Sequence, residues 1–162
     1  MTRKVMTYAP LMAVPLAAAA PPAAAQQSPP DSPRASEIKA LVEKAAALVE
    51  NQGKAAFAEF RRPSSEWFHG DTYLFSYDLK GNVLLNPGNP KREGTNPAGE
   101  KDKNGKLFHA AIIGTAESKG EGWVGYWLPK PGQTQPSQKW SYVKRVTIDG
   151  VPGLIAAGFY VE

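Results

Sequence analysis

Three consecutive segments near the C-terminus constrain the fold more than any other part of the sequence. They are GWVGYWLPKPG from Gly122, QKWSYVKRVTIDG from Gln138 and GLIAAGFYV from Gly153. They are dense in aromatic and β-branched residues and are separated by glycine and proline, a pattern typical of strands joined by turns. We therefore expect three neighbouring antiparallel strands with aromatic side chains on both faces.

Two helices and a strand hairpin are expected ahead of these strands. Apolar residues recur at helical spacing from Ser36 on, and Ala55–Phe60 has the pattern of a second, short helical segment. Asp71–Asp78 alternates, Val83–Leu85 returns after a Lys-Gly-Asn turn, and Lys106–Ser118 again has helical spacing. The order predicts an α+β fold: a five-stranded antiparallel sheet with a long N-terminal helix and a second helix packed on it, on one side of the sheet.

The first 25 residues have the order of a secretory signal peptide. Arg3 and Lys4 give a positive start, an apolar stretch follows, and small residues lead up to Ala25. The apolar stretch is shorter than the ~20 residues that a membrane-spanning helix needs. We expect cleavage near Ala25 and a periplasmic product. Residues 26–35 are rich in proline and serine and predict a tether, which leaves 36–162 as the folded domain.

Cysteine usage and charge exclude several classes of protein. The sequence has no cysteine, so it forms no disulfide and carries no lipid on a cysteine. Without Arg3 and Lys4, 17 of the 19 basic residues remain against 15 acidic ones, and they are scattered along the chain. A nucleic-acid binder gathers its basic residues on one face, so we expect no nucleic-acid partner.

The residue types that carry out catalysis or hold metals form no recognisable motif. His69 and His109 are the only histidines, and neither has the acidic neighbours of a metal-binding pattern. Both are expected to be surface or helix-capping residues. We expect no metal, no cofactor and no enzymatic activity, although a periplasmic hydrolase that uses His69 with Asp71 stays open as an alternative.

The aromatic strands are better interpreted as one wall of a small-molecule pocket. Residues 86–105 form a long loop with three Asn-Pro pairs, and loops of this length in compact domains are usually functional or disordered. Such a loop over an aromatic face would enclose a mostly apolar cavity, the usual form of a ligand site. Lys139 adds a positive charge, and Tyr77 and Asn86 can add hydrogen bonds. The pocket therefore suits a small organic anion.

These segments together resemble the periplasmic single Cache domain family, type-two subfamily. The matching elements are YLFSYDLKGNVLLNPGNP from Tyr73, NPKREGTN from Asn89, GEGWVGYWLPKP from Gly120, KWSYVKRV from Lys139 and the terminal GLIAAGFYV. Their order and spacing agree with the family from about residue 36 to residue 161. The resemblance implies an extracytoplasmic sensor module with a PAS-like sheet and a long N-terminal helix.

The resemblance also implies a ligand and a set of site residues. Family members bind small carboxylates such as acetate, propionate, lactate or pyruvate without turnover. The family's pocket positions map here to Trp123, Tyr126, Lys139 and Tyr142. Many relatives have histidine where this chain has Asn86. Relatives are usually fused to a membrane-spanning helix and a receptor or kinase, whereas this sequence ends at Glu162, so we expect a separate, membrane-bound signalling partner.

The relative placement of Lys139 and Tyr142 stays open. They are three positions apart, and residues at that spacing point to opposite faces of a regular strand. Either Lys139 precedes the strand, or a bulge re-aims it, or only one of the two residues lies in the pocket.

A purely dimerising interaction domain is the remaining alternative. A homodimer would form through the long N-terminal helix, and its sign would be a continuous apolar stripe on Ile38–Val49 that is exposed in the monomer.

Overall fold

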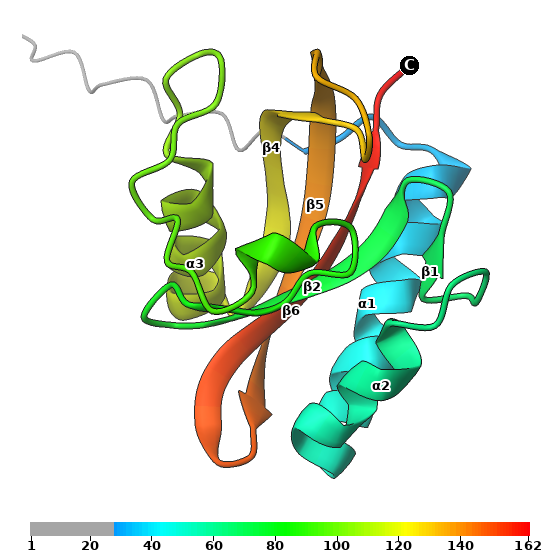
Figure 1. The fold of residues 1–162 in the computed structure, drawn as a ribbon, viewed down its shortest axis with the longest axis vertical. Coiled ribbons are helices and arrows are strands. Elements are labelled where there is room, and N and C mark those ends of the chain that lie inside the picture. The colour runs from blue at the N-terminus through cyan, green and yellow to red at the C-terminus, as the bar shows by residue number, and fades with distance from the viewer. Residues whose placement is uncertain (1–27) are drawn as a thin grey trace, which may run out of the picture.

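An antiparallel sheet with helices on both faces makes up the described part of the protein (Figure 1). The computed structural model describes residues 28–162. The predicted signal peptide, residues 1–25, and the first two residues of the predicted tether lie outside the described residues, so those assignments stay predictions.

The sheet has one strand more than the sequence indicates. Its strands are β1 (Phe68–His69), β2 (Thr72–Asp78), β3 (Val83–Leu85), β4 (Glu121–Pro129), β5 (Pro136–Ile148) and β6 (Val151–Tyr160). They run in the order β1-β2-β6-β5-β4, and β3 pairs with β2. The additional strand, β1, has two residues and pairs with the start of β2. Two residues are too few to show an alternating pattern, so the sequence gives no sign of this strand.

Helix α1 (Pro33–Gln52) begins earlier than the sequence pattern suggests. Ser32 caps its first turn, because the Ser32 hydroxyl accepts a hydrogen bond from the Ala35 amide at 3.1 Å. Pro33 occupies the first helical turn, where a missing N–H leaves no hydrogen bond unmade. The helix therefore starts three residues before the expected Ser36, and the end of the predicted tether is part of it.

The apolar stripe of α1 packs on one face of the sheet, against β5 and β6. Its buried residues are Ile38, Val42, Ala45, Ala46 and Val49. The chain continues through η1 (Gly53–Ala56) and α2 (Phe57–Phe60), whose phenylalanines extend the same core. The stripe is thus used within the protomer and is not the exposed surface that the dimerisation alternative requires.

Helix α3 (Phe108–Lys119) covers the opposite face, together with the long segment that contains η2 (Pro90–Arg92). Successive residues of β5 show the division, because Tyr142 packs in the core under α1 and Val143 in the core under α3. The helices therefore lie on both sides of the sheet, not on one side as expected. Both faces of β5 and β6 are apolar, and each needs a cover.

Candidate ligand-binding cavity

A cavity of about 510 Å³ lies between the sheet and the segment that leads from β3 to α3. Alternate residues of β2 form its floor, and Tyr126 with residues 128–133 forms one wall. The other wall comes from residues 86–100 and the first two residues of α3. The long loop therefore lies over an aromatic face of the sheet, which is the arrangement expected from the sequence.

The floor of the cavity is a row of three aromatic rings on β2. Tyr73, Phe75 and Tyr77 are alternate residues, so their side chains share one face of the strand. Neighbouring ring centroids are 6.4 and 5.4 Å apart. The tyrosines place hydroxyl groups at both ends of an otherwise apolar surface.

Lys139 lies behind one end of this floor. Its side chain is 1% exposed, and Nζ donates a hydrogen bond to the Tyr73 hydroxyl at 3.1 Å. Nζ also lies 4.3 Å from the Tyr73 ring centroid and 5.7 Å from that of Phe75, distances at which a cation is attracted to a ring face. Tyr73 lines the cavity and Lys139 does not, so the lysine charge acts on the cavity through the Tyr73 hydroxyl.

The charge of Lys139 persists at neutral pH. Burial acts to lower the pKa of Lys139, neighbouring tyrosine hydroxyls act to raise it, and the net pKa lies above the ordinary lysine value. Within residues 28–162, no acidic side chain pairs with it. The sheet therefore contains an ammonium group without a counter-ion next to an aromatic cavity.

Gly158 on β6 makes room for the lysine side chain. A Cβ atom at position 158 would lie 2.7 Å from Lys139 Cε, closer than real Cβ contacts come. The lysine stem can cross β6 toward Tyr73 because this position has no side chain. Gly88 in the covering segment has a similar role, since a Cβ there would lie 2.7 Å from the Tyr73 ring.

The wall opposite η2 is held by contacts of Tyr126. Its ring stacks on Phe108 of α3, with centroids 4.7 Å apart and an interplanar angle of 11°. Its hydroxyl shares a hydrogen bond of 2.9 Å with Ser141 Oγ. Tyr126 is thereby fixed between the sheet and the start of α3, and burial raises its pKa.

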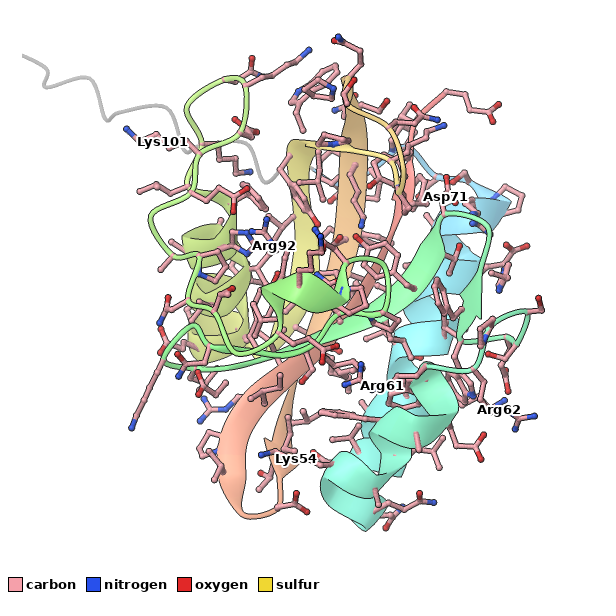
Figure 2. All side chains as sticks on the ribbon, viewed as in Figure 1. Lys54, Arg61, Arg62, Asp71, Arg92 and Lys101 are labelled. Carbon is pink, nitrogen blue, oxygen red and sulfur yellow. The ribbon has the colours of Figure 1, made fainter. Side chains whose placement is uncertain are left out.

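Arg92 brings a second positive charge to the cavity. Figure 2 shows its side chain reaching from η2 toward α3. The guanidinium pairs with Glu100, which also lines the cavity, and its Nη2 lies 3.2 Å from His109 Nε2. Arginine only donates hydrogen bonds, so His109 Nε2 accepts, and burial followed by the Arg92 charge lowers the pKa of His109 to about 4. His109 is therefore neutral at physiological pH.

An ion pair ties the covering segment to the helical layer. Arg61, at the end of α2, donates to both carboxylate oxygens of Glu93 at 2.6 and 2.9 Å. Glu93 also accepts a hydrogen bond from the backbone amide of Asn86 at 2.8 Å. These bonds hold the pKa of Glu93 below its usual value and position Asn86 at the cavity.

Four of the six residues predicted for the site are at or next to the cavity. Tyr77, Asn86 and Tyr126 line it. Lys139 contacts it through Tyr73, a residue that the sequence placed among the strand aromatics but not in the site.

Trp123 and Tyr142 lie on the other face of the sheet. Their rings are 5.1 Å apart beside α1, and the Tyr142 hydroxyl donates to Glu121 at 2.8 Å. Strand β5 pairs with both neighbours without a bulge from Lys139 to Tyr142, so the three-residue spacing separates them. We therefore leave Trp123 and Tyr142 out of the candidate site.

His109 and Arg92, two further polar residues of the cavity, differ in how well the sequence pattern indicates them. His109 is 3% exposed rather than at the surface, and it shares a helical face with Ile112 and Ala116, a spacing that could have revealed it. Arg92 lies in the long loop. Loop residues follow no hydrophobic periodicity, so the sequence does not indicate the direction of the Arg92 side chain.

His69 lies outside the cavity. It is exposed on β1, and its Nδ1 is 2.9 Å from the Ser65 carbonyl oxygen. Across residues 28–162 no three side chains of the kinds that bind metals come together. Helices with the length and apolar character of a membrane span are likewise absent from that range.

The fold and the cavity define an α+β domain with a cavity of the size of a small-molecule site between its sheet and a loop. A family model described as Cache domain matches residues 34–162. The chain belongs to the Cache domain family, and the resemblance seen in the sequence is confirmed.

Two solved structures are similar to this chain over most of their length. One is the periplasmic sensor domain of a chemotaxis protein, 31% identical with a TM-score of 0.69, covering 80% of this chain and 95% of that one. The other is a Cache chemosensory domain whose structure is described as the basis for carboxylic acid recognition. It is 25% identical with a TM-score of 0.67, covering 79% of this chain and 93% of that one.

A curated relative is much longer than this chain. The methyl-accepting chemotaxis protein McpP of Pseudomonas putida is 29% identical over 92 residues, which are 57% of this chain. The match spans 16% of the length of McpP. The family is thus that of the sensor domains of chemotaxis receptors.

Proposed function

We propose that this chain is a periplasmic sensor domain whose cavity binds a small monocarboxylate without chemical change. The observation that carries the proposal is Lys139, a buried ammonium group with no acidic partner in residues 28–162. A ligand anion that approaches a buried ammonium group without a counter-ion is stabilised, because burial leaves the attraction between the two charges poorly screened. The solved relative described for carboxylic acid recognition supports the same ligand class.

The ligand carboxylate is proposed to lie at the Tyr73 end of the floor. The Tyr73 hydroxyl accepts a hydrogen bond from Lys139, which leaves its own hydrogen for the ligand. Polarisation by the ammonium strengthens that donor. Phe75 and Phe108 offer apolar surface to a short alkyl chain, and Tyr77 and Asn86 are within the same cavity for a further polar group.

Export and signalling are part of the same proposal. Cleavage near Ala25 would release the domain into the periplasm, and binding would be passed to a membrane-bound signalling partner. The relatives support this, because they belong to chemotaxis proteins. Mass spectrometry of exported protein should give a chain that starts at Gln26, and retention of Met1 would contradict it.

The hydrolase and dimerisation alternatives have less support. A hydrolase built on His69 needs that residue in the cavity, and His69 is exposed on β1. Among residues 28–162, those that line the cavity include no serine, threonine or cysteine to act as a nucleophile. A purely dimerising domain needs the α1 stripe on the surface, and it is buried.

Calorimetric titration of the purified chain with propionate tests the proposal. Propionamide, which has nearly the same shape but no charge, is the matched control ligand. We expect propionate to bind and to stabilise the fold by about 2.7 kcal/mol at a concentration of roughly 100 times its Kd. Propionamide should bind far more weakly. No heat and no thermal shift with acetate, propionate, lactate and pyruvate alike would reject a monocarboxylate sensor.

A further inference from the structure

We infer that Glu100 is a specificity-determining residue that restricts the cavity to ligands with a single carboxylate. It does so by holding Arg92, the second positive charge of the cavity, in an internal ion pair. This inference rests on the proposed carboxylate binding and adds the reason why one negative charge is accepted and a second is refused.

The charges around the cavity leave room for one anion. Within the described residues, Lys139 has no acidic partner, whereas Arg92 is paired with Glu100. Lys130 is the remaining cation that lines the cavity in residues 28–162, and it is only half-buried in the turn between β4 and β5, so water partly screens its charge. One ligand carboxylate therefore balances the charge of Lys139. The charge of Arg92 is already balanced by Glu100, so a second ligand carboxylate has no unpaired cation to bind there.

The geometry of the ion pair closes Arg92 to a ligand. Nη2 contacts a Glu100 oxygen and also donates to His109 Nε2 at 3.2 Å, and Nη1 lies 3.5 Å from the other Glu100 oxygen. Both terminal nitrogens are thus engaged, and the two-pronged face that binds a carboxylate is occupied. A second ligand carboxylate next to the Arg92 guanidinium would lie beside the Glu100 carboxylate. The two negative charges would repel each other strongly.

Backbone contacts hold Glu100 in this position. Its amide donates to the Pro97 carbonyl oxygen at 2.9 Å, which closes a turn. Asn96 before the turn donates to the Lys80 carbonyl oxygen at 3.0 Å, and Asp102 after it accepts from the Trp127 amide at 3.1 Å. The carboxylate is therefore presented to Arg92 by a segment that is fixed on both sides.

Size alone does not exclude a dicarboxylate. The volume of about 510 Å³ is within the range of pockets that enclose molecules larger than propionate or succinate. Discrimination between these two ligands must therefore come from charge, and Glu100 is the one acidic residue that lines the cavity in the described part of the chain.

The test compares propionate and succinate in calorimetric titrations of the wild-type chain and of Glu100→Gln. Glutamine keeps the shape of Glu100 and removes its charge, so Arg92 becomes available to a second carboxylate. We expect succinate to bind at least 10-fold more tightly to the variant, or about 1.4 kcal/mol. The propionate affinity should change much less, so that the ratio of the two Kd values shifts by roughly the same factor.

Two further variants make the result specific. Glu117→Gln removes the same charge from an exposed position of α3 and should leave the ratio of Kd values at its wild-type value. The double variant Glu100→Gln with Arg92→Gln should lose the gain in succinate binding, because the gain requires the freed guanidinium. Circular dichroism and thermal melting of each variant show whether it is folded, independently of ligand binding.

The outcomes separate this inference from the proposed function. If the wild-type chain binds propionate but Glu100→Gln gains no succinate affinity, the role of Glu100 is wrong and the monocarboxylate sensor stands. The same holds if the gain persists without Arg92, since the charge of Glu100 would then act without the ion pair. If wild type binds no monocarboxylate at all, both the inference and the proposed function are overturned.

Discussion

Lys139 determines the charge that the cavity presents, although it is not part of the cavity surface. Its ammonium group is buried among aromatic rings and hydrogen-bonded to Tyr73. The pKa of Lys139 lies above the ordinary lysine value in the folded chain, so the fold holds the charged form more favourably than the unfolded chain does. Ligand binding and fold stability should therefore both fall when this charge is removed.

Lys139→Met should weaken propionate binding by about 10- to 150-fold, the equivalent of a charge-assisted hydrogen bond of roughly 1.5–3 kcal/mol. The melting temperature of the ligand-free variant should be below that of wild type, because the fold loses a group whose charged form it stabilises. Calorimetry and thermal melting of the same samples check both statements. A variant that melts lower and binds normally would show that Lys139 serves packing and not the ligand.

Lys144→Met is the matched control on the same strand. Lys144 pairs with Glu121 at 2.9 Å on the surface, where such pairs contribute about 0–1 kcal/mol. Propionate affinity should stay at the wild-type value. Equal losses in the two variants would mean that Lys139 acts only through the overall charge of the chain.

At the residue scale, the sequence predicts the strand residues of the cavity better than the loop residues. Alternation along a strand fixes the face of each side chain, so Tyr77, Tyr126 and Lys139 could be placed near one another. The same rule separates Lys139 from Tyr142, and the family pattern alone does not show this. Arg92 has no such rule, because its direction depends on the path of a loop and on its pairing with Glu100.

The segment between β3 and α3 functions as a strap that is held at its ends and in the middle. Its middle anchor is the ion pair between Arg61 and Glu93. The side chain of Glu93 is only 23% exposed. Two parallel hydrogen bonds to a carboxylate give both energy and orientation. The strap carries Asn86 and Arg92, so the position of these two polar cavity residues depends on an ion pair to the end of α2.

Arg61→Ala should loosen the strap without unfolding the sheet. The Asn86 amide, which donates to Glu93, should exchange its hydrogen at least 10-fold faster, and propionate affinity should fall several-fold because the cavity wall is less ordered. Hydrogen exchange by mass spectrometry, read over residues 83–95, measures the first effect. Unchanged protection in that segment would sink the idea of an anchor.

Arg62→Ala is the control at the element scale. Arg62, just after α2, pairs with Glu59 of that helix at 3.5 Å, and Figure 2 shows it on the outer side of α2, away from the strap. Arg62→Ala removes one positive charge, as Arg61→Ala does, and the two positions are adjacent in the chain. Exchange of the strap amides should stay as in wild type.

Elements with a clear period were predictable from the sequence, and elements without one were not. The stripe from Ile38 to Val49 and the alternation of Asp71–Asp78 gave α1 and β2. β1 is too short for a period, and η2 is a single turn inside a loop. The early start of α1 depends on the Ser32 cap followed by proline, a local signal that lies inside the proline- and serine-rich stretch whose composition predicts a tether.

For the whole molecule, His109 makes stability depend on pH in the mildly acidic range. Burial and the Arg92 charge lower its pKa from 6.5 to about 4 in the folded chain. The unfolded chain binds a proton below pH 6.5 and the folded chain does not, so the free energy of unfolding falls as pH decreases through this window. The loss should be about 2 kcal/mol between pH 7 and pH 5.

His109→Gln should remove most of this pH dependence, because glutamine can accept the hydrogen bond from Arg92 and does not titrate. Urea unfolding at pH 7 and pH 5 gives the comparison for wild type and variant. His69→Gln is the control, since His69 is exposed on β1 and should leave the difference as in wild type. If the free energy of unfolding of His109→Gln still falls between pH 7 and pH 5, groups other than His109 cause the pH dependence.

The separation of the two sheet faces has an optical consequence. The chain has four tryptophans, and none of them lines the cavity. Trp67, Trp123 and Trp140 pack in the core under α1, and Trp127 lies beneath Lys103 outside the cavity. Intrinsic fluorescence therefore cannot report ligand contact directly. A change in the emission of Trp67, Trp123 or Trp140 on ligand addition would measure a displacement that has crossed the sheet, from the binding face to the face of the long helix.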